Sequence, residues 1–215
     1  MPWIEHLQSA NWVQATGCVL GAYFLGCLAT GFYLVRARTG RDLREIESGS
    51  TGARNVGRVL GKPGFGLTVL GDLAKGVLAV WGAWEWTGNQ HLAALAMLAV
   101  VAGHIWPAQL RFRGGKGAAT SLGALLVFDY RLALTCAALF LAGFALTRKS
   151  VLPGMFAFAC LPLAGLWFDP DGSTPMVTAI LSAMILFAHR KNFVEEIAVR
   201  SARRQAVPKP ESTEL

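Results

Sequence analysis

Long runs of apolar residues, separated by short segments rich in arginine, lysine and glycine, dominate the pattern along this chain. A helix that crosses a bilayer needs about 20 largely apolar residues, and several of the runs approach or reach that length. Backbone groups in hydrocarbon must satisfy their own hydrogen bonds, so we interpret the runs as helices. The pattern predicts seven segments, at Trp12–Val35, Gly66–Trp86, His91–Leu110, Gly117–Phe128, Leu132–Leu146, Val151–Phe168 and Pro175–His189.

The fold class that follows is all-α: a polytopic integral membrane protein with one membrane-embedded domain over residues 1–200. Gly117–Phe128 is short for a span. Together with Leu132–Leu146 it could instead form a re-entrant pair, which would leave five spans. Residues 201–215 are polar and include Pro208 and Pro210, so we expect a disordered tail there.

Composition supports a membrane protein. Of the 215 residues, 53% are hydrophobic and only 15% are charged, whereas soluble domains carry about a quarter charged residues. The mean hydropathy is +0.43. The cysteines lie inside apolar runs, with no CxxC pair and no histidine at ligand spacing, so we expect buried thiols and neither a disulfide framework nor a metal site. They are Cys18, Cys27, Cys136 and Cys160.

The net charge of +7 is compatible with a nucleic-acid partner or with anionic lipid, and its distribution decides between them. In the seven-span layout, every lysine and arginine except Lys75 and Arg131 falls on one side of the membrane. By the positive-inside rule that side is cytoplasmic, which puts the N-terminus outside and the C-terminus inside. We therefore expect membrane lipid as a partner and no nucleic acid.

Three segments on the basic side could carry chemistry. Ser48–Arg58 combines hydroxyls, glycines and an arginine that can hold phosphate oxygens, although such loops are also common as solvated linkers. Arg111–Thr120 is glycine-rich and contains Lys116, but its glycine spacing is not that of a P-loop. His189–Asn192 ends the last predicted span, where a basic anchor is the alternative interpretation.

Ionisable residues within the predicted spans are the other candidates. Asp72 and Lys75 are three residues apart on one helix face, so we expect them to pair, either as a structural ion pair or in contact with substrate. His104 and His189 are the histidines at span ends on the basic side. Each stands beside one of the glycine-rich or polar segments.

Together these segments resemble the acyl-phosphate–glycerol-3-phosphate acyltransferases (PlsY), integral membrane enzymes of bacterial phospholipid synthesis. The family's Ser-Gly-Asn-x-Gly-Ala-Thr-Asn-x-x-Arg loop is matched by Ser48, Gly49, Gly52, Ala53, Asn55 and Arg58. Its Asp-x-x-Lys-Gly is matched by Asp72, Lys75 and Gly76, and its Gly-His-x-x-Pro by Gly103, His104 and Pro107. Its Phe-x-Gly-Gly-Lys-Gly-x-Ala-Thr is matched by Phe112, Gly114, Gly115, Lys116, Gly117, Ala119 and Thr120, and its His-Arg-x-Asn by His189, Arg190 and Asn192.

The resemblance implies transfer of an acyl group from acyl phosphate to the sn-1 hydroxyl of glycerol 3-phosphate, giving lysophosphatidate and phosphate. It implies no cofactor and no metal, a multi-pass protein of the bacterial inner membrane with its site facing the cytoplasm, and a link to the enzyme that supplies the acyl phosphate. The implied catalytic residues are Ser48, His189 and Asn192. The implied substrate-binding residues are Gly49, Ser50, Arg58, Lys75, His104, Gly114, Gly115, Lys116 and Gly117.

Within that scheme Arg58 and Lys116 would neutralise phosphates, and His189 or His104 would bind phosphate or assist proton transfer. A substrate-assisted route, in which the leaving phosphate accepts the hydroxyl proton, is the favoured hypothesis, because no Ser-His-Asp constellation is evident. The motif in which Asp follows His by four residues is absent from the sequence, which argues against an acyl-CoA enzyme of that class.

Departures from the family pattern keep other interpretations open. Ser50 stands where the family has Asn, and Arg54 stands where it has Thr. After Asn192, Glu195–Ala198 replaces the usual basic and Gly-x-Glu continuation. The alternatives are therefore a catalytically impaired or altered-acceptor relative, and a small membrane transporter, although the chain shows no internal repeat.

Overall fold

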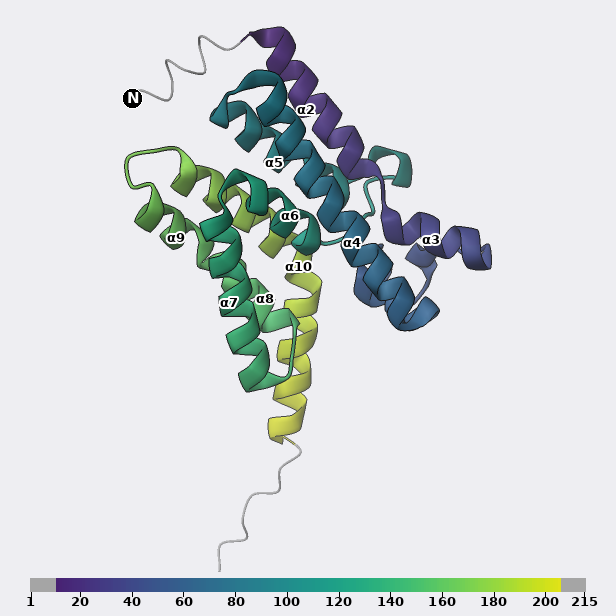
Figure 1. Cartoon of the computed structure of the whole chain (residues 1–215). Helices are drawn as coiled ribbons and strands as arrows, with labels where there is room; N and C mark the ends of the chain where they lie inside the picture. The colour runs from purple at the N-terminus through teal and green to yellow at the C-terminus, as the bar shows by residue number, and fades with distance from the viewer. Residues whose placement is uncertain (1–10, 206–215) are drawn as a thin grey trace, which may run out of the picture.

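The computed structural model describes the backbone of residues 11–205 and the side chains of residues 11–194, and within these every regular element is a helix (Figure 1). The α-helices are α2 (Trp12–Cys27), α3 (Thr30–Thr39), α4 (Ala53–Thr87), α5 (Gln90–Ile105), α6 (Ala118–Phe128), α7 (Tyr130–Thr147), α8 (Val151–Ala159), α9 (Leu161–Phe168) and α10 (Thr174–Gln205). Two short 3₁₀ helices, η1 (Leu43–Glu45) and η2 (Ala108–Leu110), lie in the connections.

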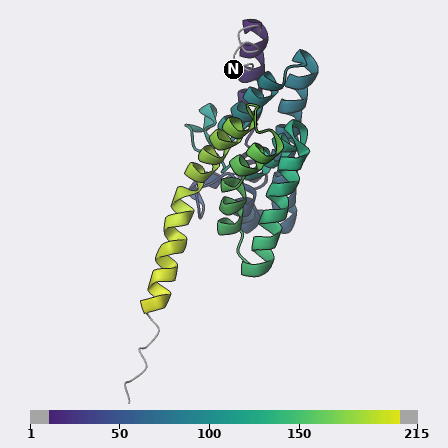
Figure 2. The same ribbon diagram turned by 90° about the vertical axis from the view of Figure 1, so that its left-hand side faces the viewer.

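The helices form two groups joined by α6. Helices α2, α4 and α5 pack against one another, and α7, α8, α9 and α10 form the second group, as the two views show (Figures 1 and 2). Helix α6 contacts α4 and α5 on one side and α7 on the other. The main apolar core runs through both groups and includes Met97, Leu125 and Leu181, all fully buried.

The first predicted span, Trp12–Val35, is wrong as a single helix. The chain leaves α2 at Leu28 and Ala29, whose backbone is non-helical, and α3 then turns away from the α2 axis (Figure 1). Broken helices at membrane depth need partners for the carbonyls they release. The Lys75 ammonium donates to the carbonyls of Gly26 (3.1 Å) and Leu28 (2.9 Å), and the Gln109 amide donates to that of Cys27.

Lys75 belongs to a buried cluster of charged and polar side chains. Its ammonium lies 3.0 Å from a carboxylate oxygen of Asp72, which confirms the predicted pairing on one helix face. The same carboxylate accepts a hydrogen bond from the Thr30 hydroxyl (3.2 Å), and His104 Nδ1 lies 3.6 Å away. An unpaired charge at this depth would be costly, so the cluster holds α3, α4 and α5 in one arrangement.

Glycines let the helix backbones approach closely in the first group. A Cβ at Gly26 would lie 2.2 Å from the Val100 carbonyl oxygen, and one at Gly103 would lie 2.1 Å from that of Tyr23. The α4–α6 contact has the same character, because a Cβ at Gly76 would lie 2.1 Å from the Thr120 carbonyl oxygen. Small residues at such crossings are the usual basis of helix packing in membranes.

Several element boundaries differ from the sequence-based ones. Helix α4 begins at Ala53, before the predicted Gly66, but it is two helical stretches joined at a kink at Gly61 (φ 68°). The second stretch, which contains Pro63, corresponds to the predicted segment and begins a few residues earlier. The predicted Val151–Phe168 segment is two helices that meet at Cys160. Helix α10 continues to Gln205, into the predicted tail, and the rest of that tail lies outside the described residues.

Five apolar stretches among the described residues are long enough to cross a membrane, so the chain is an all-α integral membrane protein. They are Trp12–Thr39, Ala53–Thr87, Gln90–Leu110, Tyr130–Thr147 and Val151–Phe168. Helix α6 is apolar but has only 11 residues. The choice between seven and five spans therefore stays a prediction.

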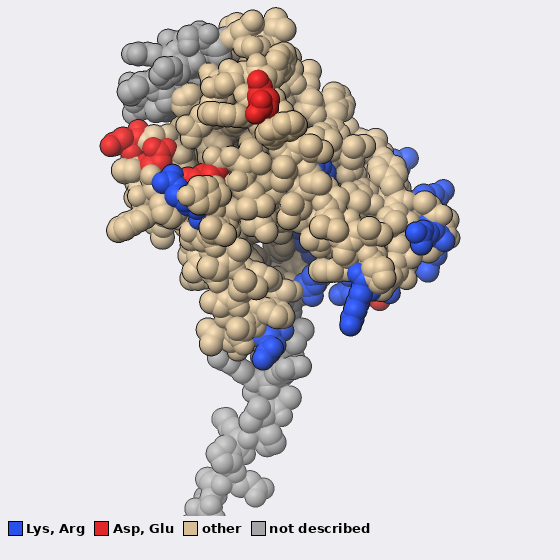
Figure 3. All heavy atoms as spheres, viewed as in Figure 1, with Lys and Arg blue, Asp and Glu red and all other residues tan. Residues whose placement is uncertain are grey.

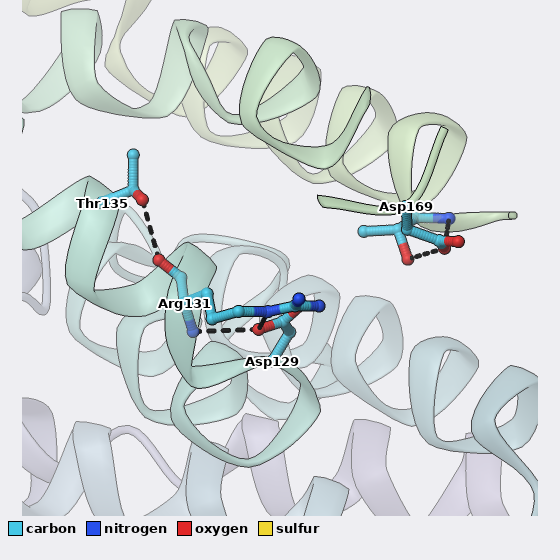
Figure 4. A network of polar contacts seen from close by, with 5 residues as sticks. Asp129, Arg131, Thr135 and Asp169 are labelled. Carbon is cyan, nitrogen blue, oxygen red and sulfur yellow. Dashed lines mark hydrogen bonds and ion pairs between the residues drawn. The ribbon is translucent and has the colours of Figure 1, made fainter. Parts of the chain in front are cut away.

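Charges are segregated along the molecule. Most lysines and arginines visible in Figure 3 lie on the right-hand and lower parts of the molecule, while most visible acidic side chains lie toward the opposite, upper-left end. At that opposite end Arg131 forms an ion pair with Asp129 (2.7 Å), and the Asp169 carboxylate accepts a hydrogen bond from the Thr174 hydroxyl (2.6 Å) (Figure 4). These local polar contacts stabilise the α6–α7 and α9–α10 connections. The direction of insertion predicted from the basic loops is compatible with this separation and stays a prediction.

The close helix contacts make a testable prediction. We expect Gly103→Ala to lower the melting temperature of the detergent-solubilised protein by several degrees, because the added methyl would meet the Tyr23 carbonyl and force α2 from α5 at a cost of about 1–3 kcal/mol. Gly82→Ala is the matched control, since a Cβ there meets nothing within 4 Å. Equal melting temperatures for the two variants would contradict the packing argument.

Candidate active site

A cavity of 720 Å³ lies between the two helix groups. It is lined by residues of α4, α5, α6, α7, α8 and α10 and by the segments that precede α4 and α6. It has two kinds of wall. The polar part contains Ser48, Ser50, Arg54, Arg58, Lys116, His189 and Asn192. The apolar part includes Val69, Leu122, Phe140, Leu141 and Phe158. A cleft between the two lobes of the molecule, with lysine and arginine at its lower edge, is visible in the space-filling view (Figure 3).

The loop that carries Ser48 and Ser50 is held in place by one buried amide. Asn55 donates through Nδ2 to the carbonyls of Leu43 (3.2 Å), Ile46 (2.9 Å) and Ser50 (3.0 Å). The amide group supplies two hydrogens, so one of them is shared between two of these carbonyls, and the side chain is 1% exposed. The loop geometry therefore depends on Asn55.

Arg44 ties this loop to the segment after α5. Its guanidinium binds the Asp42 carboxylate at 2.6 Å and also donates to the Leu110 carbonyl at 2.8 Å. The Arg44 hydrogen bonds hold the pKa of the Asp42 carboxyl below its usual value, so the pair is charged at neutral pH. The two glycine-containing segments that flank the cavity are thus connected through ordinary polar contacts.

The glycine-rich segment packs directly on the end of α5. Gly115 N donates to the His104 carbonyl (3.0 Å), Gly114 N donates to the Ile105 carbonyl (3.1 Å), and Thr51 N donates to the Gly114 carbonyl (3.3 Å). A Cβ at Gly115 would lie 2.0 Å from His104 Nε2. Glycine is required here because the backbone lies against the imidazole, which leaves no room for a side chain.

Two helices begin at the cavity, and neither has a side-chain cap. Gly52 precedes α4 and donates its own N–H to the Ser50 hydroxyl (3.3 Å), and Gly117 precedes α6. Among the described residues, no capping side chain accepts from the first N–H groups within either helix. Residues of both first turns line the cavity. Uncapped N–H groups at a helix N-terminus carry partial positive charge and bind anions well. The cavity therefore offers two anion-binding ends, each beside cationic side chains.

Lys116, Asn192 and His189 bring the glycine-rich segment and α10 together. The Lys116 ammonium donates to the Asn192 side-chain oxygen. His189 Nδ1 lies 2.9 Å from the Ile185 carbonyl, which can only accept, so Nδ1 carries the hydrogen and Nε2 is the nitrogen able to take a proton. Arg54 also lines this part of the cavity.

The structure brings most of the predicted site residues together. Those that line the cavity are Ser48, Ser50, Arg58, His104, Lys116, Gly117, His189 and Asn192. Gly49, Gly114 and Gly115 lie in the loops behind it, and Lys75 is engaged at the α2–α3 break instead of lining the cavity. The roles assigned to these residues stay predictions.

Other lining residues were not assigned a site role from the sequence. Arg54 was noted only as a departure and Asn55 only as part of a motif, yet both line the cavity, as does Asp72. The apolar wall, including Cys136 and Phe140, gave no signal, because apolar residues in a membrane helix look alike whether they face lipid, core or cavity. The distinction needs the packing of α6, α7 and α8.

The role of Asn55 can be tested by comparing two identical substitutions. Asn55→Asp replaces the donating amide by a carboxylate facing three carbonyls, so we expect faster proteolytic cleavage within residues 40–52 and a lower melting temperature. Asn89→Asp is the control. The Asn89 side-chain oxygen accepts hydrogen bonds from His91 N and Leu92 N at the start of α5, and an aspartate oxygen can accept the same bonds. Similar cleavage rates in both variants would show that Asn55 does not fix the loop.

Comparison with known proteins agrees with this arrangement. The sequence profile of the glycerol-3-phosphate acyltransferase family matches residues 16–198. The chain is 45% identical over 187 residues to glycerol-3-phosphate acyltransferase 1 of Desulfitobacterium hafniense, covering 87% of this chain and 93% of the relative. It is 38% identical to the enzyme of Halorhodospira halophila, covering 86% and 94%.

Solved structures lead to the same family. The crystal structure of PlsY (YgiH), an integral membrane glycerol 3-phosphate acyltransferase, in its glycerol 3-phosphate form superposes with a TM-score of 0.80 at 30% identity. The lysophosphatidic acid form gives 0.76 at 28%. Each comparison covers 86% of this chain and 93% of the other. The family predicted from the motifs is confirmed: this chain belongs to the glycerol-3-phosphate acyltransferases.

Proposed function

We propose that the protein transfers a fatty acyl group from an acyl phosphate to the sn-1 hydroxyl of glycerol 3-phosphate, giving lysophosphatidate and phosphate. The acceptor follows from the family and from the glycerol 3-phosphate form of the related PlsY structure. The identity of the acyl donor is argued from the residues that line the cavity. We further propose that the site faces the cytoplasm of a bacterial inner membrane, because the basic loops and the polar end of the cavity coincide.

The observation that carries the proposal is the meeting of two uncapped helix starts in one cavity. Both substrates of the reaction carry a phosphate, so the site must hold two anions close together. The first turns of α4 and α6 supply free N–H groups, and Arg58 and Lys116 supply full charges beside them. Acyl-CoA, in contrast, presents no phosphate next to the acyl carbonyl.

The apolar wall of the cavity suits the fatty acyl chain of the donor. Leu122, Phe140, Leu141 and Phe158 continue from the polar end of the cavity into the region between α6, α7 and α8. Burial of an alkyl chain there would contribute about 0.8 kcal/mol per CH₂ group. A donor with an anionic head and a long apolar tail matches this division, which favours an acyl phosphate that is itself embedded in the bilayer.

The chemistry proceeds without a covalent acyl-enzyme in this proposal. The acceptor hydroxyl oxygen attacks the acyl carbonyl carbon, the bond from that carbon to the phosphate oxygen breaks, and the hydroxyl proton passes to the departing phosphate. Among the contacts of the described residues, no serine hydroxyl of the cavity bonds a histidine, so an activated serine has no support. His189 Nε2 is the alternative proton acceptor.

Lys116 and the helix starts would act on charge in the transition state. Negative charge develops on the carbonyl oxygen and on the leaving phosphate, and fixed donors at those places lower the barrier. Ser48 and Asn192 would orient the two substrates. The Asn192 side-chain oxygen also accepts a hydrogen bond from the Lys116 ammonium. These roles extend the motif-based predictions to a site whose members share one cavity.

A second candidate is an impaired or altered-acceptor relative, and the position of Arg54 favours testing it. Arg54 adds a cation to the cavity where the family resemblance has threonine, and Ser50 shortens the side chain where it has asparagine. The transporter alternative loses its support now that the family is established.

Turnover by the purified protein tests the main proposal. With glycerol 3-phosphate as acceptor, we expect lysophosphatidate from palmitoyl phosphate and none from palmitoyl-CoA. Lys116→Ala should lower kcat/KM by roughly 100- to 1,000-fold, the usual effect of removing one charge-stabilising donor. Arg38→Ala, which removes an exposed cation of α3 that does not line the cavity, is the control. Equal product from both donors would contradict the donor assignment.

The double variant Ser50→Asn, Arg54→Thr tests impairment. If the native residues already support turnover, we expect the double variant to change kcat by less than about threefold with glycerol 3-phosphate and palmitoyl phosphate. A gain of an order of magnitude or more would show that this chain is an impaired relative. Glycerol 3-phosphate titrations of both proteins separate a change in acceptor binding from a change in the chemical step.

A further inference from the structure

A second hollow, of 310 Å³, adjoins the reaction cavity on the side of α4. Its wall comes from one stretch of α4 and consists of Arg54, Gly57, Arg58, Gly61, Lys62 and Phe65. Arg54, Arg58 and Phe65 line both spaces, so the two communicate. Lys62 and the two glycines line only the second space, which we call the α4 groove.

Local backbone chemistry creates the α4 groove. Arg54 and Arg58 are one turn apart on the same helix face. Gly57 keeps this face open, because a Cβ there would already lie 3.2 Å from the Phe65 Cβ. Gly61 interrupts the helix at φ 68°, which glycine adopts without strain, and Lys62 follows directly at the edge of the groove.

Positive charge in the α4 groove exceeds the negative charge available to balance it. Arg58 pairs with Glu47 at 3.5 Å, and both side chains are about half exposed. Among the described residues, no ion pair to Arg54 or Lys62 is found, and the first turn of α4 has no acidic residue. Cations beside a helix N-terminus repel the helix dipole, so this arrangement is unfavourable unless an anion binds.

The surroundings indicate where such an anion comes from. Phe65 at the groove is 43% exposed, and further along α4 Leu67 and Leu70 are 51% and 65% exposed. Phe65 lines both hollows, whereas Leu67 and Leu70 line neither, and exposed apolar side chains of this kind on a membrane helix face lipid. The groove therefore has cations at one end and a lipid-facing surface at the other. A phosphate group carried on a lipid satisfies both parts, whereas a free anion satisfies only the cations.

We propose that the α4 groove is an accessory site for the phosphomonoester headgroup of a lipid, separate from the place of acyl transfer. Arg54 and Lys62 hold the phosphate, and Arg58 is shared with the reaction cavity. The identification of the occupant as the reaction's own lysophosphatidate, leaving sideways toward the bilayer, rests on the proposed function. Binding of a phosphomonoester lipid as such does not.

Binding measurements on the full chain test the α4 groove independently of turnover. The probes are dipalmitoyl phosphatidate, which carries a phosphomonoester, and dipalmitoyl phosphatidylcholine, which does not, each titrated into protein in neutral detergent and followed by native mass spectrometry. We expect phosphatidate to bind more tightly. Lys62→Gln should weaken phosphatidate binding about fivefold, the effect of removing one cation near a lipid headgroup.

Arg41→Gln is the matched control, because it removes one positive charge from an exposed position on the same basic side but outside the groove. Equal weakening by Lys62→Gln and Arg41→Gln, or equal affinity for the two lipids, would overturn the proposal. Melting temperatures confirm that both variants are folded. Lys62 is exposed, so its replacement is tolerated structurally.

Inorganic phosphate separates the two possible sources of the anion. If millimolar phosphate leaves phosphatidate bound, the lipid-borne phosphomonoester is the ligand. Displacement by phosphate in the native protein, lost in Lys62→Gln, would overturn the lipid assignment in favour of the free anion. A protein that binds phosphatidate as expected but forms no lysophosphatidate would contradict the proposed function and leave the accessory site standing.

Discussion

The ammonium of Lys75 at the break between α2 and α3 is the contact on which the rest of the structure depends. Carbonyls released by a broken helix in hydrocarbon have no water to bind, and each would cost several kcal/mol if left alone. Lys75 satisfies those of Gly26 and Leu28, and Asp72 neutralises its charge. The break therefore exists only while α4 lies against it.

Once the break is fixed, the path of the chain to the cavity follows. Helix α3 leaves the axis of α2, and the connection after it returns through η1 to the start of α4. Asn55 and Arg44 then fix that connection to its neighbours. The close glycine contact at Gly76 sets the start of α6 against the later part of α4. The hydrogen bond from Thr51 N to the Gly114 carbonyl joins the segments that precede α4 and α6. Helix ends that are far apart in sequence thus meet at one polar cavity.

The same arrangement separates positive charge from apolar surface over a short distance. Helix starts, Lys116 and the arginines of α4 lie at one end of the cavity, and aromatic and aliphatic side chains lie at the other. An amphiphilic substrate is oriented by such a gradient before any specific contact forms. The α4 groove repeats the pattern on a smaller scale, with cations beside a lipid-facing helix surface.

The sequence by itself determined the class of the protein, its family and most of the residues that share the cavity. Long apolar runs can be stable only as membrane helices, and the glycine, lysine and histidine motifs have spacings that few families use. The pairing of Asp72 with Lys75 was likewise predictable, because residues three apart on a helix must face the same way.

Tertiary structure decided what those local patterns leave open. The sequence contains no signal for the break at Leu28, since that segment is as apolar as a continuous span, and the break is stable only because Lys75 reaches it from 47 residues away. For the same reason Lys75 proved to contact the backbone instead of lining the cavity. The apolar wall and the α4 groove also depend on which helices lie side by side, because hydropathy records that a residue avoids water and not what it faces instead.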